Sequence, residues 1–382
     1  MDDLLKLVSA LVKIPSVNPP HGEGLRDCAN FIRGYFSDHG YNAEVVEFDK
    51  GWPNIIVSNG KKSDKSIMLN GHYDVVPTGD LKSWTYDPFS GLILEDKIYG
   101  RGSSDMKSGL AAQMKVFVEL ADKLDYNLVF TAVPDEESGG FHGAKHLAEK
   151  YKPNLVLVSE PSGSEWINIG EKGLLQVKLK SKGKVAHGSL PSLGDNAIMK
   201  IVRDLMNLEK IRDVKIPIPS ELRDAISARA SSEVERDYVS ISFNPGVIKG
   251  GVKVNVVPDY AEAEVDMRIP PGIKNSEALS LVKRLVSESE VEPIDLSEPN
   301  YTNPENPYVK KLEVTISKTL GIRPKNYIIT GATDGRYFRN KGIPAIVYGP
   351  GELGVAHTYN EFVSFKEVIN AYKVIREYLL SI

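Results

Sequence analysis

The sequence has one cysteine in 382 residues, so it cannot form a disulfide within the chain. Cys28 shares a helical stripe with Leu25, Ile32 and Phe36, and we interpret it as a buried structural residue. No apolar run approaches the roughly 20 residues needed to span a bilayer. The segment 1–16 carries two acids at its start and therefore lacks the basic n-region of a signal peptide. We therefore expect a cytoplasmic protein with no membrane partner.

An excess of positive charge is also missing. The chain has 47 Lys and Arg against 51 Asp and Glu, a formal net charge of −4, which argues against a nucleic-acid partner. The sequence shows no internal repeat and no low-complexity segment. At about 150 residues per domain, the length predicts two or three domains, each able to bury a core.

The first 160 residues alternate strand-like and helix-like patterns. Short apolar runs occur at 54–60, 66–76, 127–133 and 154–160, and helical periodicity occurs at 105–124 and 141–151. Continuous apolar strands between helices are typical of a sheet covered on both faces. We therefore predict an α/β domain with a wound, at least partly parallel sheet.

The pattern changes near Gly173 and changes back before the C-terminus. Strand-like runs at 173–183, 238–246 and 261–269 are interleaved with helical runs at 196–211 and 276–288. This order predicts a small α+β layer with helices on one face of an antiparallel sheet. Helical runs at 306–321 and 367–382 then flank a strand at 343–351. We predict a domain at 173–297 inserted between two parts of the first domain, 1–172 and 298–382.

Metal-competent side chains follow the apolar runs, where wound sheets bind ligands. These residues are His72, Asp74, Asp135, Glu136, Glu137, Glu160 and His357. Asp105 opens a helix after "GRGSSD" and by itself would be interpreted as a helix cap. Carboxylates and imidazoles converging on one crevice are the ligands expected for zinc or a similar ion. Successive strand residues point opposite ways, so one of Glu136 and Glu137 can hold a metal while the other acts as general base.

Less specific interpretations exist for several of these residues. The stretch "DEES" alone is typical of a solvated acidic turn. His142 and His146 have the four-residue spacing of helical zinc ligands, but no glutamate follows His142, and we interpret both as surface or supporting residues. The glycines of "GRGSSDMKSG" lack the spacing of a nucleotide-binding loop, so nucleotide binding is excluded.

As a set, nine short motifs resemble those of one enzyme family. They are "NGHYDVVP", "GRGSSDMKSG", "VPDEESGG", "SEPSG", "GKVAHGSLP", "GGVKVNVVPD", "DMRIPP", "GATDGR" and "VAHTYNE", in this order from residue 70 to 361. The family is that of the zinc-dependent amidohydrolases and exopeptidases, which includes acetylornithine deacetylase, succinyl-diaminopimelate desuccinylase, aminoacylase and glutamate carboxypeptidase.

The resemblance implies a catalytic domain with two divalent metal ions, expected to be zinc, with cobalt or manganese as alternatives. His72 and Glu160 would bind one ion, Glu137 and His357 the other, and Asp105 would bridge them. Glu136 would be the general base, and Asp74 would hydrogen-bond His72. The peptide bond after Asp105 is expected to be cis.

The resemblance also gives the inserted domain a role as lid and dimerisation domain of a homodimer. His187 would reach the partner's active site and stabilise the oxyanion. Asn255 and Arg268 would bind substrate, with Gly331 and Thr333 lining the same pocket. From the sequence alone, Arg268 could instead pair with Asp266 or Glu264 on a surface strand, and Asn255 has similar standing.

The implied activity is cleavage of the amide bond of an N-acyl amino acid by a metal-bound hydroxide, as in acetylornithine deacetylase or succinyl-diaminopimelate desuccinylase. The alternative is a carboxypeptidase or dipeptidase that acts on short peptides with the same metal site. A catalytically silent binding module is the third reading. Silent relatives would be expected to lose a ligand or the base, whereas all five ligand positions and Glu136 are present here.

Overall fold

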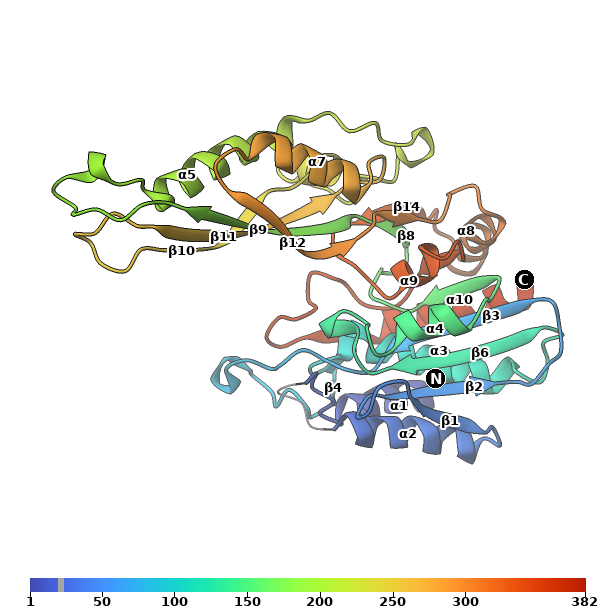
Figure 1. The fold of residues 1–382 in the computed structure, drawn as a ribbon. Coiled ribbons are helices and arrows are strands. Elements are labelled where there is room, and N and C mark those ends of the chain that lie inside the picture. Colours follow the sequence, from blue (N-terminus) through green and yellow to red (C-terminus); the bar gives the residue numbers. More distant parts are fainter. Residues whose placement is uncertain (20–23) are drawn as a thin grey trace. The chain divides into compact units, whose positions relative to one another are not determined.

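The apolar runs of the sequence become sheet strands in the computed structural model, which describes residues 1–19 and 24–382. The chain divides into two units, each with its own core (Figure 1). The first unit comprises residues 1–169, 302–327 and 333–382. The second unit comprises residues 170–301 and 328–332.

The sheet of the first unit is parallel at its centre. Its strands are β1 (Ala43–Glu47), β2 (Pro53–Ser58), β3 (Ser66–His72), β6 (Asn127–Val133), β7 (Leu155–Val158), β15 (Ala345–Val347) and β8 (Trp166–Glu171). They are ordered β1-β2-β6-β3-β7-β15-β8, and the same sheet continues from β8 to β13 (Asn300–Tyr301), while β14 (Lys325–Ile329) also pairs with β8. The four central strands β6, β3, β7 and β15 run parallel, while β1, β2 and β8 are antiparallel to their neighbours. The predicted wound, at least partly parallel sheet is confirmed, and its centre is mainly parallel.

Helices cover both faces of this sheet, which explains why its strands are apolar on both sides. The helices of the first unit are α1 (Asp2–Val12), α2 (Leu25–Asp38), α3 (Ser108–Leu120), α4 (Ala144–Lys150), α8 (Pro307–Leu320), α9 (Gly335–Arg339) and α10 (Phe365–Ser381). α4 and α9 pack on one face through a shared apolar cluster, and α2 and α3 pack on strands of the other face (Figure 1). Cys28 lies buried in α2, as predicted.

The ends of α8 show how local residue choice sets an element's limits. The side chain of Asn306 accepts the N–H of Tyr308, and Pro307 occupies the first helical position, where a missing N–H costs nothing. Gly321 ends the helix in the left-handed conformation, at φ 70°.

A small second sheet lies in the first unit and was not predicted. It consists of β4 (Leu92–Leu94), β5 (Lys97–Tyr99) and β16 (Phe362–Ser364), ordered β16-β5-β4. β16 pairs antiparallel with β5, and Phe362 faces Tyr99. The pairing joins segments more than 250 residues apart in the chain and places residues 100 and 361 next to each other.

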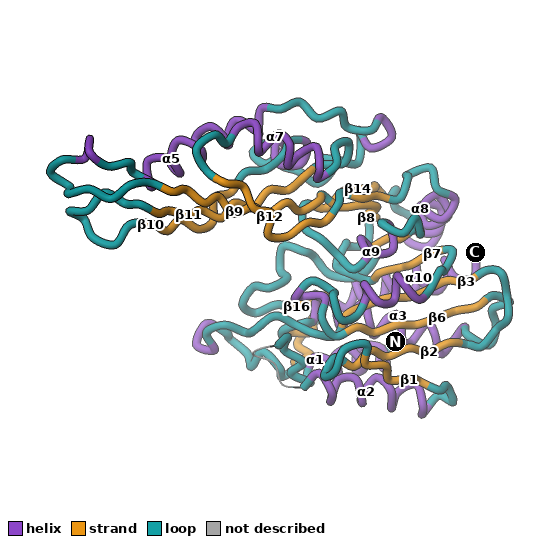
Figure 2. Tube along the Cα trace, in the orientation of Figure 1, coloured by secondary structure: helices purple, strands orange, loops and turns teal. Residues whose placement is uncertain are grey.

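The second unit is an antiparallel sheet with helices on one face, as predicted (Figure 2). Its strands β9 (Gly173–Lys182), β10 (Asn244–Gly250), β11 (Tyr260–Ile269) and β12 (Glu290–Ser297) are ordered β10-β11-β9-β12. The helices α5 (Ala197–Leu208) and α7 (Asn275–Leu285) pack on the buried side chains of β9 and β11. Both strands alternate strictly between buried and half-buried residues, which is the signature of a sheet covered on one face. The shorter elements are α6 (Glu235–Val239), β13 (Asn300–Tyr301) and β14 (Lys325–Ile329), which ends in this unit.

The predicted strand at 238–246 is wrong for most of its length. Residues 235–239 form α6, and β10 begins only at Asn244. The buried ammonium of Lys172 donates hydrogen bonds to the carbonyls of Asp237 and Ser240. These carbonyls accept hydrogen bonds from a lysine and not from a neighbouring strand. The apolar alternation at 238–246 therefore predicted a strand where most of the segment forms none.

The structure contains a strand, β12, that the sequence analysis left out. Pro293 lies within it, and proline cannot donate to a strand ladder. β12 is at the end of the strand order, and its register with β9 shifts between Pro293 and Asp295. An edge position with a bulge is where a sheet tolerates proline.

Among the described residues, no helix has both the length and the apolar character needed to cross a membrane.

Candidate metal centre

The parallel strands deliver three acidic or imidazole side chains to one edge of the first unit's sheet. His72 is the last residue of β3, Glu160 lies two residues beyond β7, and Glu137 lies in the turn Glu136–Ser138 after β6. The carboxyl ends of parallel strands meet at one edge, so residues far apart in sequence come together there. Asp105 reaches the same edge from the turn Ser103–Lys107 before α3.

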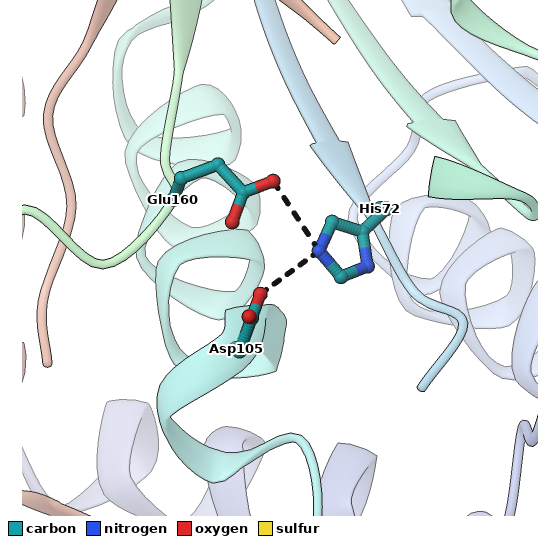
Figure 3. A group of neighbouring side chains, drawn as sticks. All are labelled: His72, Asp105 and Glu160. Carbon is teal, nitrogen blue, oxygen red and sulfur yellow. Dashed lines mark hydrogen bonds and ion pairs between the residues drawn. The ribbon is translucent and has the colours of Figure 1, made fainter. Parts of the chain in front are cut away.

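The first group consists of His72, Asp105 and Glu160 (Figure 3). Nε2 of His72 lies 3.1 Å from Oδ1 of Asp105 and 3.4 Å from Oε1 of Glu160. All three residues are buried. The peptide bond between Asp105 and Met106 is cis, as the resemblance predicts.

The second group consists of Asp105, Glu137 and His357. Nε2 of His357 lies 3.1 Å from Oε1 of Glu137 and 3.3 Å from Oδ2 of Asp105. Asp105 therefore turns one carboxylate oxygen to each group. The five residues that the sequence analysis proposed as ligands are brought together in the pairing that it proposed.

The donor atoms suit divalent cations. Within each group, one ligand atom per residue lies within 4.8 Å of the others. Nitrogen and oxygen ligands of zinc lie about 2.0–2.2 Å from the ion, so ligand atoms on opposite sides are at most about 4.4 Å apart. Small side-chain movements would bring either group around one ion.

The protein by itself does not neutralise this cluster of acids. Burial raises the pKa of Glu160 to about 8 and that of Glu137 to about 7. Hydrogen bonds to Asp105 and Glu137 raise the pKa of His357 to about 10. Burial opposes ionisation of Asp105, but the hydrogen bonds from His357 and His72 hold its pKa below the ordinary value. Two imidazoles do not supply enough positive charge for this number of buried carboxylates. Bound divalent cations would supply the rest and so stabilise the adjacent carboxylates.

Glu136 is a member of neither group among the described residues. Burial, followed by the charge of Glu160, raises its pKa well above the ordinary value, and His72 acts in the opposite direction. Its carboxyl group therefore lies within electrostatic reach of the first group without being part of it. This is the position expected of an acid that exchanges protons rather than binding metal.

Asp74 does more than the sequence analysis expected. Nδ1 of His72 lies 2.9 Å from the backbone carbonyl of Asp74 and 3.4 Å from its carboxylate. The carboxylate also accepts the backbone N–H groups of Glu136 and Glu137, both at 3.2 Å, and the side-chain amide of Asn18 at 2.6 Å. Asp74 therefore orients one imidazole and holds the turn that carries the two glutamates.

His187 and Asn255 lie side by side in the second unit. The N–H of Gly188 donates to the carbonyl of Asn255 at 2.8 Å, and both His187 and Asn255 are exposed. Nδ1 of His187 accepts the N–H of Ser189 at 3.2 Å. The proton of a neutral imidazole then lies on Nε2, which is the tautomer able to donate to an oxyanion.

Arg268 lies in β11 on the face opposite α5 and α7. Its Nε lies 3.0 Å from Oδ1 of Asp266, so the ion pair that the sequence analysis left open is present. Gly331 belongs to the second unit, and a Cβ added there would meet only the side chain of Ile329, at 3.9 Å, whereas Thr333 belongs to the first unit and is buried. The substrate-binding roles of Asn255, Arg268, Gly331 and Thr333 stay predictions.

His142 and His146 belong to neither metal group among the described residues. Both face Asp49, at 2.8 Å and 3.2 Å from Oδ2. Trp52 stacks on His142, and Phe48 stacks on His146. The two histidines attach α4 to the loop between β1 and β2.

Asp334 is a further acidic residue near the first group that the sequence pattern did not single out. It is buried, and the side-chain amide of Asn70 in β3 donates to its carboxylate at 3.4 Å. Burial raises its pKa to about 6, while the charge of His72 acts in the opposite direction. Its position in "GATDGR", next to Thr333, was the available signal.

Two carboxylate–imidazole groups that share one aspartate at the edge of a wound sheet define a class, the metal-dependent hydrolases with a two-metal centre. The family model described as "Peptidase family M20/M25/M40" matches residues 68–381, and the chain belongs to this family. It is thus a metallohydrolase, and the resemblance inferred from the motifs is confirmed.

Curated relatives match over nearly the whole chain. An uncharacterized metallohydrolase of Methanocaldococcus jannaschii is 28% identical over 429 aligned residues, with 99% of each chain covered. A probable succinyl-diaminopimelate desuccinylase of Staphylococcus aureus is 28% identical over 366 residues, with 88% of each covered. Among solved structures, an M20 family metallo-carboxypeptidase from Sulfolobus solfataricus has a TM-score of 0.82 at 24% identity, covering 100% of this chain and 99% of its own. That structure supports the fold.

Proposed function

We propose that this protein hydrolyses the amide bond of an N-acyl amino acid, of the acetylornithine or succinyl-diaminopimelate type, with two divalent metal ions that we expect to be zinc. The observation that carries the proposal is Asp105, which turns one oxygen to each of two ligand groups while Glu136 stays outside both. A relative over 88% of the chain bears the name of a desuccinylase, which favours this substrate class.

In the proposed centre, His72, Glu160 and Asp105 would hold one ion, and Asp105, Glu137 and His357 would hold the other. Ions bound there would polarise the scissile carbonyl and lower the pKa of water. Asp74 would keep the imidazole of His72 and the turn of Glu136 and Glu137 in place. This support matters because small displacements of reacting groups are costly in rate.

Glu136 would move the proton that the reaction requires. Its carboxylate takes a proton from the attacking water as the bond from water oxygen to carbonyl carbon forms. It then delivers that proton to the amide nitrogen as the carbon–nitrogen bond breaks. The products are the free acyl acid and the amino acid, so no further reactant is needed.

We further propose that the inserted domain, 173–297, acts as lid and dimerisation domain. His187 would then stabilise the oxyanion in the partner's site, with Asn255 beside it. Arg268 would bind the substrate carboxylate by exchanging part of its pairing with Asp266. Gly331 and Thr333 would line the same pocket. The cytoplasmic location stays a prediction.

A substrate panel tests the proposal. Protein reconstituted separately with zinc, cobalt and manganese is assayed on acetylornithine, succinyl-diaminopimelate and carboxyl-terminal dipeptides, with kcat/KM as the readout. We expect an acylated amino acid to exceed every dipeptide by about tenfold or more, which corresponds to about 1.4 kcal/mol of transition-state discrimination. The reverse order would support a carboxypeptidase or dipeptidase, and hydrolysis of none with two ions bound would contradict the proposal.

The proposed action of His187 in the partner's site predicts complementation between two inactive variants. His187→Ala is expected to lower kcat by about 10²–10³-fold, the usual effect of removing one oxyanion donor. In a hybrid dimer of His187→Ala with Glu136→Gln, one site has both intact residues. Random exchange should therefore restore about a quarter of wild-type activity.

Tagging the two variants differently allows the hybrid dimer to be isolated. Each variant mixed with itself serves as the control. An isolated hybrid dimer without activity would contradict the arrangement in trans.

A further inference from the structure

A buried ion pair lies beneath the loops that carry two of the proposed ligands. Nη1 of Arg101 lies 2.7 Å from Oε2 of Glu361, and the two side chains are 3% and 0% exposed. Neither residue belongs to a metal group among the residues that the structure describes. A buried ion pair is a poor source of stability compared with apolar packing, so its other contacts indicate what it does.

The small sheet of the first unit creates this pair. Arg101 follows β5 by two residues, and Glu361 immediately precedes β16. Tyr99 faces Phe362 in antiparallel register. The pairing extends one step further, because the N–H of Gly100 donates to the carbonyl of Glu361 at 2.9 Å. The two charged residues therefore meet by strand pairing, not by chance contact of long side chains.

Glu361 holds the backbone of the shared aspartate. Its Oε1 accepts the N–H of Ser104 at 2.9 Å and the N–H of Asp105 at 3.1 Å. The carboxylate thus uses one oxygen for the turn that presents Asp105 and the other for Arg101.

Arg101 holds the backbone of the second imidazole. It donates to the carbonyl of Thr358 at 3.2 Å and to that of His357 at 3.4 Å. His357 has a φ of 62°, in the left-handed region, which is unfavourable for a non-glycine residue. The loop needs outside support to present this residue, and the guanidinium supplies it.

We propose that Arg101 and Glu361 form a positioning pair that sets His357 against Asp105 and so determines metal affinity in the group of Asp105, Glu137 and His357. This inference rests on the proposed two-metal function. In the group of His72, Asp105 and Glu160, the imidazole comes from the end of β3. The hydrogen bonds of Arg101 to the carbonyls of His357 and Thr358 do not hold that strand. Arg101 therefore acts mainly on one of the two ions, whereas Glu361 also holds the backbone of Asp105, which both groups share.

Arg101→Lys tests the proposal, with Co²⁺ alone as the probe. Lysine keeps the positive charge beside Glu361 but lacks the planar fork that reaches several acceptors. Equilibrium titration of the metal-free protein is expected to give two ions for the wild type. In R101K one ion should be weakened by about 10–100-fold, the usual cost of losing a group that orients a ligand.

A double-variant cycle separates positioning from general destabilisation. H357A should bind one ion, and adding R101K in the H357A background should leave that ion's affinity within about threefold. E361Q, which keeps the charge of Arg101 but neutralises its partner, is a second probe. It should weaken the same ion as R101K and, because Glu361 also holds Asp105, the other ion by a smaller factor. R339K changes a buried guanidinium that donates to the carbonyl of Ala345, and it controls for loss of folding stability, read by thermal unfolding.

Selective weakening of one ion in R101K, with no further weakening when R101K is added to H357A, supports the pair as a positioning device. Equal weakening of both ions in R101K, or further weakening of the remaining ion when R101K is added to H357A, overturns it while leaving the proposed function intact. A wild-type protein that binds fewer than two ions overturns both.

Discussion

Replacing Glu136 with glutamine is expected to lower kcat by about 10²–10⁴-fold while both metal ions stay bound. Glutamine has nearly the shape of glutamate but cannot take a proton from water. Glu136 lies outside both ligand groups, so its loss should not remove a metal contact. Its carboxyl group lies within electrostatic reach of Glu160 and His72, where a proton acceptor is required.

The measurement is kcat on the best substrate of the panel, together with metal content by elemental analysis. Glu149→Gln is the matched control, because Glu149 is exposed in α4 of the same unit. Activity close to wild type in E136Q would mean that another group takes the proton. Loss of an ion in E136Q would mean that Glu136 is a ligand and not the base.

Asp105→Asn is expected to remove both ions and to reduce activity to background. The two oxygens of Asp105 face different imidazoles, at 3.1 Å and 3.3 Å. Asparagine offers one neutral oxygen where the centre needs a negatively charged carboxylate with one oxygen for each ion. His357→Ala, which changes a member of one group only, should instead leave one ion bound.

Metal content after dialysis and the turnover of the same samples check this prediction. Asp64→Asn serves as the control for the aspartate-to-asparagine change, because Asp64 is exposed in the loop before β3. Retention of two ions in D105N would contradict its bridging position. Loss of both ions in H357A as well would show that the two groups do not bind metal separately.

Much of the first unit could be predicted because its signals are local. Continuous apolar runs mark the buried parallel strands, and the residues just beyond them, His72 and Glu160 among them, must lie at one edge of the sheet. The strict alternation in β9 likewise indicated a sheet covered on one face. The family motifs then linked these positions into one metal centre.

Errors arose where a local signal was overridden by distant contacts. The alternation at 238–246 resembled a strand, but the ammonium of Lys172 takes the carbonyls of Asp237 and Ser240. Proline is unfavourable within most strands because it cannot donate to the ladder, yet the bulged edge strand of a sheet accommodates Pro293.

The sequence by itself determined the class of protein and pointed to the candidate metal ligands, because strand periodicity and ligand type are properties of neighbouring residues. Only the tertiary structure decided which oxygen of Asp105 faces which imidazole, and that Asp74 holds the glutamate turn. It alone decided that Arg101 meets Glu361 across 260 residues of chain. Such contacts depend on the register between strands that are far apart in the sequence, such as β5 and β16. No periodicity within either segment encodes that register.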